Sequence, residues 1–219
     1  LTPELVQHLK DAGLDSLQVT LYSHDAAVHN ALVGSDHFAD TVQGIRNAVA
    51  AGLDISINTP LCKKNADYEA TLAFAHSLGV RFATASGLIC TGMAGINHAE
   101  YDLSTEELTA IVANAKAFCN EHEMEMDFTS PGLIPKEKLE ELGMNVPMCG
   151  AALSNMAIAP DGTVVPCQSW LGADAGLGNI LTDPFDKIWK HPKAVSLRRM
   201  TEEQALSCPF RTQKGGDRR

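Results

Sequence analysis

The sequence lacks long hydrophobic runs and any excess of basic residues. No stretch approaches the roughly 20 apolar residues of a membrane-spanning helix, and none has the pattern of a signal peptide. The chain holds 17 Lys and Arg against 27 Asp and Glu, for a formal net charge of −10. Binding to phosphate backbones or anionic membranes needs clustered Lys and Arg, so we expect no nucleic-acid and no membrane partner. These absences predict a cytoplasmic protein.

Cysteine is also scarce, since the 219 residues hold 6. That number is too small for a disulfide scaffold, and in a reduced compartment clustered thiols more often bind a metal or carry out redox chemistry. An initiator Met is missing as well, because the chain opens on Leu1. Thr2 and Pro3 then read as the capped start of a helix. We therefore expect a fragment of a longer protein.

Helical and strand patterns alternate over residues 1–130. Helices are predicted between Thr2 and Gly13 and over residues 38–51, 66–78 and 105–121; strands are predicted over 16–22, 55–58, 80–85 and 124–128. This alternation is typical of right-handed βαβ units with a parallel sheet. Four strands cannot close an eight-stranded barrel. The predicted fold class is therefore α/β, with residues 1–130 forming the later half of a TIM-like β/α barrel.

The pattern changes after residue 130. Residues 131–219 predict a second, small domain with a short helix near 136–142, a hairpin, a Gly-rich loop at 172–178 and helices near 184–190 and 193–203. So short a segment buries little core, and a metal staple would stabilise it.

Two thiols flank the hairpin of this second domain. Cys149 precedes it and Cys167 follows it, and Pro160-Asp161-Gly162 forms the turn between the arms 155–159 and 163–165. Asp161 is expected to be the turn residue and not a catalytic acid. Folding of the turn should bring the two sulfurs within about 7 Å, the span of the outer ligands of a cubane cluster.

The spacing Cys149-x12-Gly162-x4-Cys167 resembles the opening signature of the SPASM or "twitch" auxiliary-cluster domain of radical S-adenosylmethionine enzymes. The later Gly178-Asn179-Ile180, together with residues 185–189 (FDKIW), is similar to a further segment of that domain. Upstream, residues 19–34, Phe38, Gly44-Ile45 and Asn65 resemble the middle of the radical S-adenosylmethionine barrel in peptide-modifying members. The resemblance covers nearly the whole chain.

The resemblance implies radical chemistry. In the family, a 4Fe–4S cluster in the barrel, reduced by an external electron donor, cleaves S-adenosylmethionine to a radical that abstracts hydrogen from a substrate. An auxiliary cluster then accepts an electron or positions the substrate. The implied substrate is a peptide or protein side chain, with a small cofactor precursor as second choice. The implied function of this chain is to hold the auxiliary 4Fe–4S cluster of such an oxidoreductase or maturase.

The resemblance also assigns site residues. The implied metal ligands are Cys149, Cys167 and Cys208, since thiolates are the ligands that iron–sulfur clusters take. The implied cofactor-binding residues lie at the carboxyl ends of strands, where β/α barrels place their active sites. They are Thr20, Asn58, Ser86 and Gly87.

The sequence departs from the family pattern in three places. The Cys-x-x-x-Cys-x-x-Cys of the radical cluster is absent, so this chain alone is expected to be inactive, and S-adenosylmethionine with a second 4Fe–4S cluster is expected only together with a missing N-terminal part. After Cys208 no Cys follows two residues on, which leaves three thiolates and is closer to a twitch domain. Val33 and Asn30 stand where members commonly have Arg and Asp.

Other interpretations remain open. Cys149 and Cys167 could be two buried thiols, or could bind zinc, because a sulfur-rich site does not distinguish zinc from iron. The alternative function is a non-catalytic iron–sulfur or zinc module for electron transfer or interaction; a metal-free barrel enzyme is a third reading. Cys119 is expected in a core, and His24 and His29 in a loop after the first strand.

Overall fold

The structure is a computed structural model that describes residues 1–89, 92–171 and 174–199. By its internal contacts the chain divides into two compact units. The first holds Leu1–Leu88 with Asn97–Val146, and the second holds the short segment between these ranges and the chain from Pro147 onward. The division falls later than residue 130, where the sequence predicts the domain boundary. Each unit is described by itself below.

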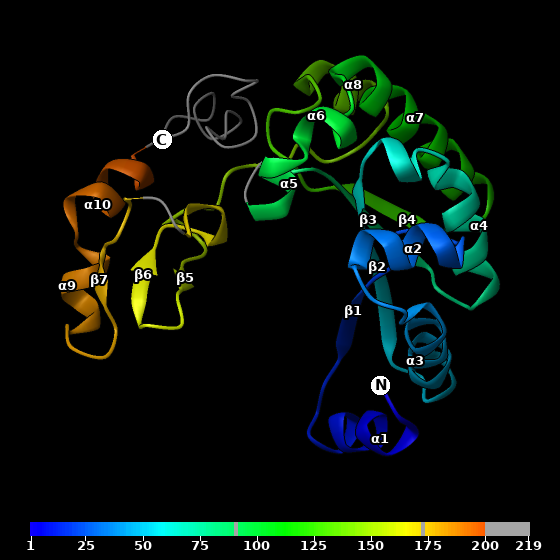
Figure 1. The fold of residues 1–219 in the computed structure, drawn as a ribbon, viewed down its shortest axis with the longest axis horizontal. Coiled ribbons are helices and arrows are strands. Elements are labelled where there is room, and N and C mark those ends of the chain that lie inside the picture. The colour runs from blue at the N-terminus through cyan, green and yellow to red at the C-terminus, as the bar shows by residue number, and fades with distance from the viewer. Residues whose placement is uncertain (90–91, 172–173, 200–219) are drawn as a thin grey trace. The chain divides into compact units, whose positions relative to one another are not determined.

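The first unit is built on a four-stranded parallel sheet. Its strands, in spatial as well as chain order, are β1 (Ser16–Thr20), β2 (Asp54–Leu61), β3 (Phe82–Gly87) and β4 (Glu125–Phe128). The predicted parallel α/β arrangement is thereby confirmed. Within the described residues β1 and β4 each pair along one edge only, so the sheet is open (Figure 1).

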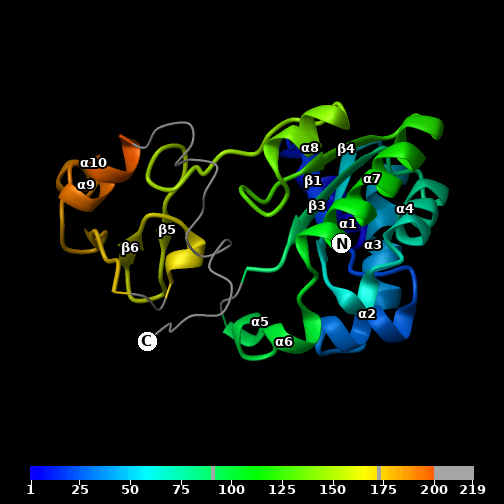
Figure 2. The ribbon, with the colours of Figure 1, turned by 90° about the horizontal axis from the view of Figure 1, so that it is seen from above.

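Helices cover one face of this sheet. The helices of this unit are α1 (Pro3–Asp11), α2 (Ala26–Val33), α3 (Phe38–Ala50), α4 (Tyr68–Ser77), α6 (His98–Tyr101), α7 (Thr105–Glu121) and α8 (Lys136–Glu141), with a 3-10 turn at Lys63–Asn65. Figure 2 shows α2, α3, α4 and α7 on the same side of the strands. Alternate strand residues such as Ile57, Ala85 and Phe128 are buried under these helices, because successive side chains of a strand point to opposite faces. The opposite face keeps the partly exposed, mostly polar residues.

Side-chain caps fix where several helices begin. The Thr2 hydroxyl accepts a hydrogen bond from Leu5 N, and Ser104 forms a capping box with Glu107, as the sequence predicts. α2 was not predicted. Asp25 starts it by accepting hydrogen bonds from the backbone N–H of residues 27 and 28, at 2.7 and 3.0 Å. The prediction that His29 lies in a loop is therefore wrong, since His29 is a buried residue of α2.

The second unit contains a three-stranded antiparallel sheet of β5 (Ala157–Ile158), β6 (Thr163–Val165) and β7 (Gly178–Asn179). A 3-10 turn (Gln168–Trp170), α9 (Phe185–Trp189) and α10 (Pro192–Arg198) follow the chain, and α5 (Gly92–Ile96) belongs to this unit. Its small core consists of Ala152, Val164, Leu177, Ile188 and Ala194.

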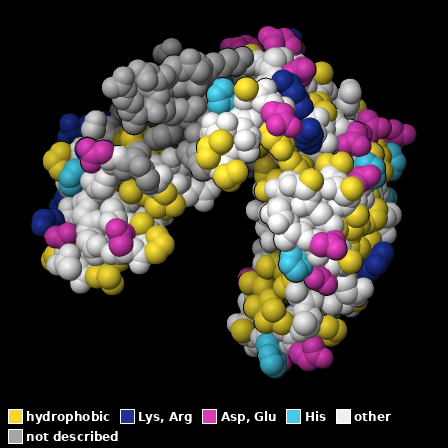
Figure 3. Space-filling view, viewed as in Figure 1, with side chains coloured by type: hydrophobic (Ala, Val, Ile, Leu, Met, Phe, Trp, Pro, Cys, Tyr) yellow, Lys and Arg dark blue, Asp and Glu magenta, His cyan; other side chains and the backbone are white. Residues whose placement is uncertain are grey.

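The short helix α5 carries exposed hydrophobic side chains. Figure 3 shows hydrophobic side chains on the visible surface of α5, where Met93 and Ile96 are 69% and 74% exposed. Among the described residues, no helix combines the length and apolarity needed to cross a membrane.

α10 begins one residue earlier than the sequence predicts. The residues from 200 onward lie outside the described residues, and they include the predicted end of that helix and Cys208.

Candidate functional site

A compact loop carries Cys149 into the second unit. The carbonyl oxygen of Gly150 accepts backbone hydrogen bonds from Leu153, Ser154 and Asn155, at 3.0, 3.0 and 3.2 Å. Gly150 has no room for a side chain, because a Cβ there would lie 2.5 Å from Ser154 Oγ. A larger residue after the first thiol would therefore require the Ser154 side chain to move.

The loop is joined directly to the segment before Cys167. The backbone N–H of Ala152 donates to Pro166 O at 2.8 Å, and Ala157 pairs with Val165 in the antiparallel sheet. Both cysteine-bearing segments thus meet at the same end of the hairpin. Cys149 and Cys167 are each half-buried, so both thiols adjoin solvent and protein.

The chemistry of this donor set fits a sulfur-ligated metal centre. Soft thiolates are the ligands preferred by iron–sulfur clusters and by zinc. Within the described residues, no group of three or more His, Cys, Asp and Glu side chains could hold a metal ion. The third predicted ligand, Cys208, lies outside those residues.

The hairpin turn is held by the Gly-Asn-Ile segment on β7. Asn179 Nδ2 donates to Asp161 O at 2.8 Å, and Ile180 N donates to Gly162 O at 2.9 Å. Gly162 has φ +85°, and a Cβ on it would lie 2.6 Å from Asn179 Oδ1. Asp161 Oδ1 accepts from Thr163 N, a hydrogen bond that lowers the pKa of this exposed carboxyl. These signature residues therefore build the hairpin, and Asp161 is the turn residue that the sequence predicts.

The open face of the first sheet brings together three of the four predicted cofactor-binding residues. Thr20 and Asn58 are register partners on β1 and β2, and Ser86 pairs with Pro60, two residues further along. Thr84 lies beside Asn58 and donates a hydrogen bond to Asn58 Oδ1 at 3.0 Å. Polar groups from three strands thus line the carboxyl half of this face.

Gly87 is placed differently. It belongs to the buried face, its N–H donates to Ser130 Oγ at 2.9 Å, and a Cβ there would lie 2.3 Å from Leu133 Cδ1. Its backbone N–H is therefore already used inside the protein. Sequence reasoning missed two polar residues of the open face, Thr84 and Asp127, which the alternation of the strands Phe82–Gly87 and Glu125–Phe128 could have identified.

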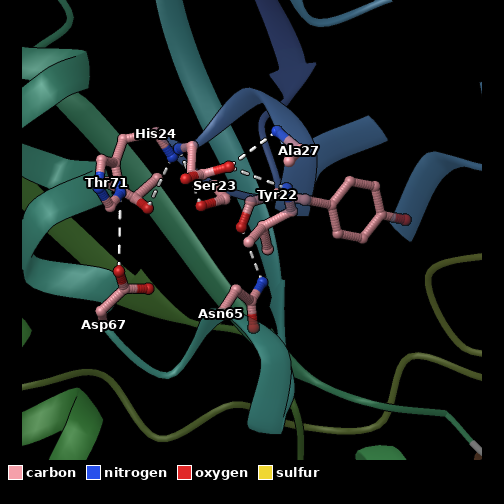
Figure 4. A network of polar contacts seen from close by, with 9 residues as sticks. Tyr22, Ser23, His24, Ala27, Asn65, Asp67 and Thr71 are labelled. Atoms are coloured by element: carbon pink, nitrogen blue, oxygen red, sulfur yellow. Dashed lines mark hydrogen bonds and ion pairs between the residues drawn. The ribbon is translucent and has the colours of Figure 1, made fainter. Parts of the chain in front are cut away.

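Asn65 ties the loop after β1 to the loop after β2. Its side chain is fully buried, donates to Tyr22 O at 2.8 Å and to Pro60 O at 3.0 Å, and accepts from Cys62 N at 2.7 Å. Figure 4 shows Asn65 beneath this loop. One buried amide therefore joins the loops that follow two neighbouring strands.

The loop after β1 also contacts residues at the start of α4. His24 N donates to Thr71 Oγ1 at 3.2 Å, and His24 Nδ1 lies 3.8 Å from Asp67 Oδ2 (Figure 4). His29, one turn into α2, accepts from Tyr22 N through Nδ1, and the rings of Tyr22 and Phe38 pack edge-on against it. Burial lowers the pKa of His29, so the neutral imidazole is favoured.

Two cysteines belong to the core of the first unit. Cys62 and Cys119 are 1% and 0% exposed. Burial raises the pKa of the Cys62 thiol and raises that of Cys119 to about 11. Both remain protonated thiols and are poor metal ligands, since the thiolate is the ligating form. The expectation that Cys119 lies in a core is confirmed.

Comparisons with known proteins agree with this geometry. Residues 149–209, which contain both half-buried thiols, match the family model of SPASM, an iron–sulfur cluster-binding domain. The AdoMet-dependent heme synthase of Nitratidesulfovibrio vulgaris is 24% identical over 233 residues, covering 95% of this chain and 60% of the relative. The PqqA peptide cyclase of Ruegeria pomeroyi is 28% identical over 218 residues, covering 95% of this chain and 55% of the relative.

Solved structures share the fold. Native anSMEcpe with bound AdoMet superposes with a TM-score of 0.64 at 14% identity, covering 95% of this chain and 57% of that one. Streptococcus suis SuiB bound to the precursor peptide SuiA gives a TM-score of 0.61 at 14% identity, covering 84% and 44%. This chain spans about 60% of the length of the first curated relatives it matches.

The parallel sheet, the thiol-bearing hairpin and the SPASM match define an α/β protein with an iron–sulfur domain. Residues 149–209 match the SPASM iron–sulfur cluster-binding family model, and the chain as a whole is similar to AdoMet-dependent heme synthases and PqqA peptide cyclases.

Proposed function

We propose that this chain is part of a radical S-adenosylmethionine oxidoreductase or maturase and holds its auxiliary 4Fe–4S cluster. The observation that carries the proposal is the convergence of the segments bearing Cys149 and Cys167, joined by the Ala152 N to Pro166 O hydrogen bond, inside the SPASM match. Cys208, within the same match, is the third ligand of the proposal. We assign the cluster to residues 131–219.

The open sheet face supports a barrel role for residues 1–130. Helices cover only its other face, and within the described part of the chain β1 and β4 are both unpaired edges, as in a segment of a larger closed sheet. Thr20, Asn58 and Ser86 line the carboxyl half of this face and are proposed to bind S-adenosylmethionine; Asn58 lies three residues before the end of β2, not at the strand end that the sequence predicts. Gly87 is proposed to act through its carbonyl, because its N–H is bonded to Ser130.

The bound clusters and S-adenosylmethionine would supply one-electron chemistry and hydrogen abstraction. The radical cluster itself requires residues outside this chain, so the chain alone is proposed to be inactive. The residues of this chain would orient the cofactor and position the auxiliary cluster. An external reductant supplies the electron, and thiolate ligation suits a cytoplasmic location.

The proposed substrate is a peptide or protein side chain. Relatives at 28% and 24% identity are PqqA peptide cyclases, and one structural neighbour is SuiB bound to its precursor peptide. A small cofactor precursor is the second candidate, because other relatives are heme synthases and probable GTP 3',8-cyclases. A non-catalytic iron–sulfur or zinc module is the alternative function.

Anaerobic reconstitution of the chain with iron and sulfide tests the cluster. We expect about four iron and four sulfide per chain and broad absorption near 400 nm. Cys149→Ala and Cys167→Ala should lose most of the iron, whereas Cys119→Ala, the control for a core thiol, should keep it. A colourless product without iron, or one that binds a single zinc ion instead, contradicts the iron–sulfur assignment.

The catalytic part is tested in the longest protein that the gene encodes. A Cys-x-x-x-Cys-x-x-Cys motif upstream of residue 1, with reductive cleavage of S-adenosylmethionine to 5′-deoxyadenosine, supports the enzyme. If the full gene lacks such a motif, the non-catalytic module is the correct reading.

A further inference from the structure

Arg198, at the end of α10, is bound to the loop that follows Cys149. Its Nε donates to Ala152 O at 2.7 Å, and its guanidinium carbon lies 3.7 Å from the centroid of the Trp189 ring. Stacking on an indole and a directed hydrogen bond together fix the plane of the guanidinium. The side chain is therefore held in one orientation by two elements of the second unit.

Ala152 is the residue through which Arg198 reaches both cysteine-bearing segments. While its carbonyl accepts from Arg198, its N–H donates to Pro166 O at 2.8 Å, immediately before Cys167. A continuous series of hydrogen bonds thus runs from α10 through the loop of Cys149 to the end of β6. Removing Arg198 removes the outer anchor of this series.

The backbone of Ala152 needs such an anchor. Its φ is +56°, a left-handed conformation that costs an L-residue about 1–2 kcal/mol. Conformations of this kind persist only where surrounding contacts hold them. Ala152 is fully buried, and its two backbone groups are bonded to three partners, at residues 155, 166 and 198.

Arg198 also carries an uncompensated group. Its Nη2 is buried and has no hydrogen-bond partner among the described residues. A buried N–H donor without a partner is unfavourable, and on a guanidinium the best partner is an anionic acceptor. A thiolate-ligated iron–sulfur cluster is anionic and accepts hydrogen bonds at its sulfurs.

We propose that Arg198 is a positioning residue for the auxiliary cluster: it fixes the loop of Cys149 through Ala152 and places a positive charge that stabilises the reduced cluster. This inference rests on the proposed function for the presence of the cluster. A nearby cation favours the more negative redox state and so raises the reduction potential. The hydrogen bond to Ala152 separately slows the opening of the loop.

The experiment compares Arg198→Met, Arg198→Lys and the control Arg199→Met. Arg199 is the next residue, is exposed and loses the same charge when replaced. For each reconstituted chain, the reduction potential is measured by spectroscopic titration and iron release to a chelator is timed. Without cluster, the alkylation rate of Cys149 is measured by mass spectrometry.

Arg198→Met should lower the potential and speed both iron release and Cys149 alkylation about tenfold, the effect of losing one charge-assisted hydrogen bond. Arg198→Lys should restore the potential, because the charge remains, but not the rate of iron release, because Lys lacks the Nε–H and the planar fork. Arg199→Met should match the parent. If Arg198→Met matches the parent in reduction potential or in alkylation rate, the inference is overturned.

The two hypotheses fail in different ways. A parent chain that binds no iron contradicts the proposed function, and the alkylation rates of the cluster-free chains then still decide whether Arg198 holds the loop. An iron-loaded parent whose potential does not respond to Arg198→Met contradicts only the inference. If Arg198→Met fails to fold, as judged by circular dichroism, the potential and release rate of Arg198→Lys decide.

Discussion

Thr84 Oγ1 donates to Asn58 Oδ1 at 3.0 Å, between neighbouring strands on the open face of the first sheet. Gln18 Nε2 in turn donates to Thr84 Oγ1 at 3.2 Å, so side chains from β1, β2 and β3 are linked. With its carbonyl oxygen occupied, the Asn58 side chain presents its NH2 group, for which no described residue is an acceptor. The Asn58 side chain is thus held by its carbonyl oxygen while its NH2 group remains available as a hydrogen-bond donor.

Asn58→Ala is expected to weaken S-adenosylmethionine binding by roughly threefold to tenfold, the effect of losing one hydrogen bond. The affinity is measured by calorimetry in the longest protein that the gene encodes. Ser56→Ala is the control, because Ser56 lies on the same strand and the same face but towards its amino end. Equal affinities for the two variants would remove Asn58 from the proposed binding face.

Asn65→Ala is expected to lower the free energy of unfolding by about 3 kcal/mol, because buried backbone groups of Tyr22, Pro60 and Cys62 lose their partner. Urea denaturation measures the change. Asn145→Ala is the matched control: Asn145 is exposed and makes one side-chain hydrogen bond, to Asp127, so its loss should cost about 0.5 kcal/mol or less. A similar small loss for Asn65→Ala would show that the amide does not hold the two loops.

His29 is expected to make the folded state less stable in acid. Burial lowers its pKa in the folded state below the ordinary value of about 6.5, so the unfolded chain binds the proton more readily. Stability is therefore complete above about pH 6.5 and falls as the pH drops from there towards the lower pKa of the folded state.

The variant His29→Asn, which does not titrate in this range, should lose less stability than the parent between pH 7.5 and pH 5. Urea unfolding at the two pH values measures this. His8→Asn, a change at an exposed position, should keep the pH dependence of the parent. If the dependence is the same in all three proteins, the neutral state of His29 does not contribute to it.

Gly162→Ala is expected to destabilise the second unit by about 2 kcal/mol, since φ +85° is left-handed and the new Cβ would lie 2.6 Å from Asn179 Oδ1. Iron retention after reconstitution should fall with it, because this turn closes the hairpin between the thiols. In the control Gly176→Ala, the Cβ would meet Thr163 Cγ2 at an ordinary 3.6 Å. Both proteins are compared by thermal unfolding and iron content; equal results would mean that the turn tolerates a side chain.

Local signals in the sequence identified much of the fold. The caps at Thr2 and Ser104 predicted where two helices begin, and the alternation of helix and strand predicted the parallel sheet. Both signals depend on residues only a few positions apart in the chain. α2 was missed because its residues Ala26–Val33 show little amphipathic pattern, and its start depends on the single cap Asp25. The strand β2 extends to Leu61, beyond the predicted residue 58, because pairing with β3 continues through a proline.

Some features of the candidate site follow from the sequence, and others depend on the tertiary structure. The sequence by itself determined the identity of the thiols, the hairpin turn at Asp161 and Gly162, and the family resemblance, because thiolate chemistry and turn conformation reside in the residues themselves. Only the tertiary structure decided that Gly87 turns its N–H to Ser130, that Thr84 joins Asn58, and that Arg198 reaches Ala152. These contacts join residues far apart in the chain, and strand register and packing, not local pattern, bring them together.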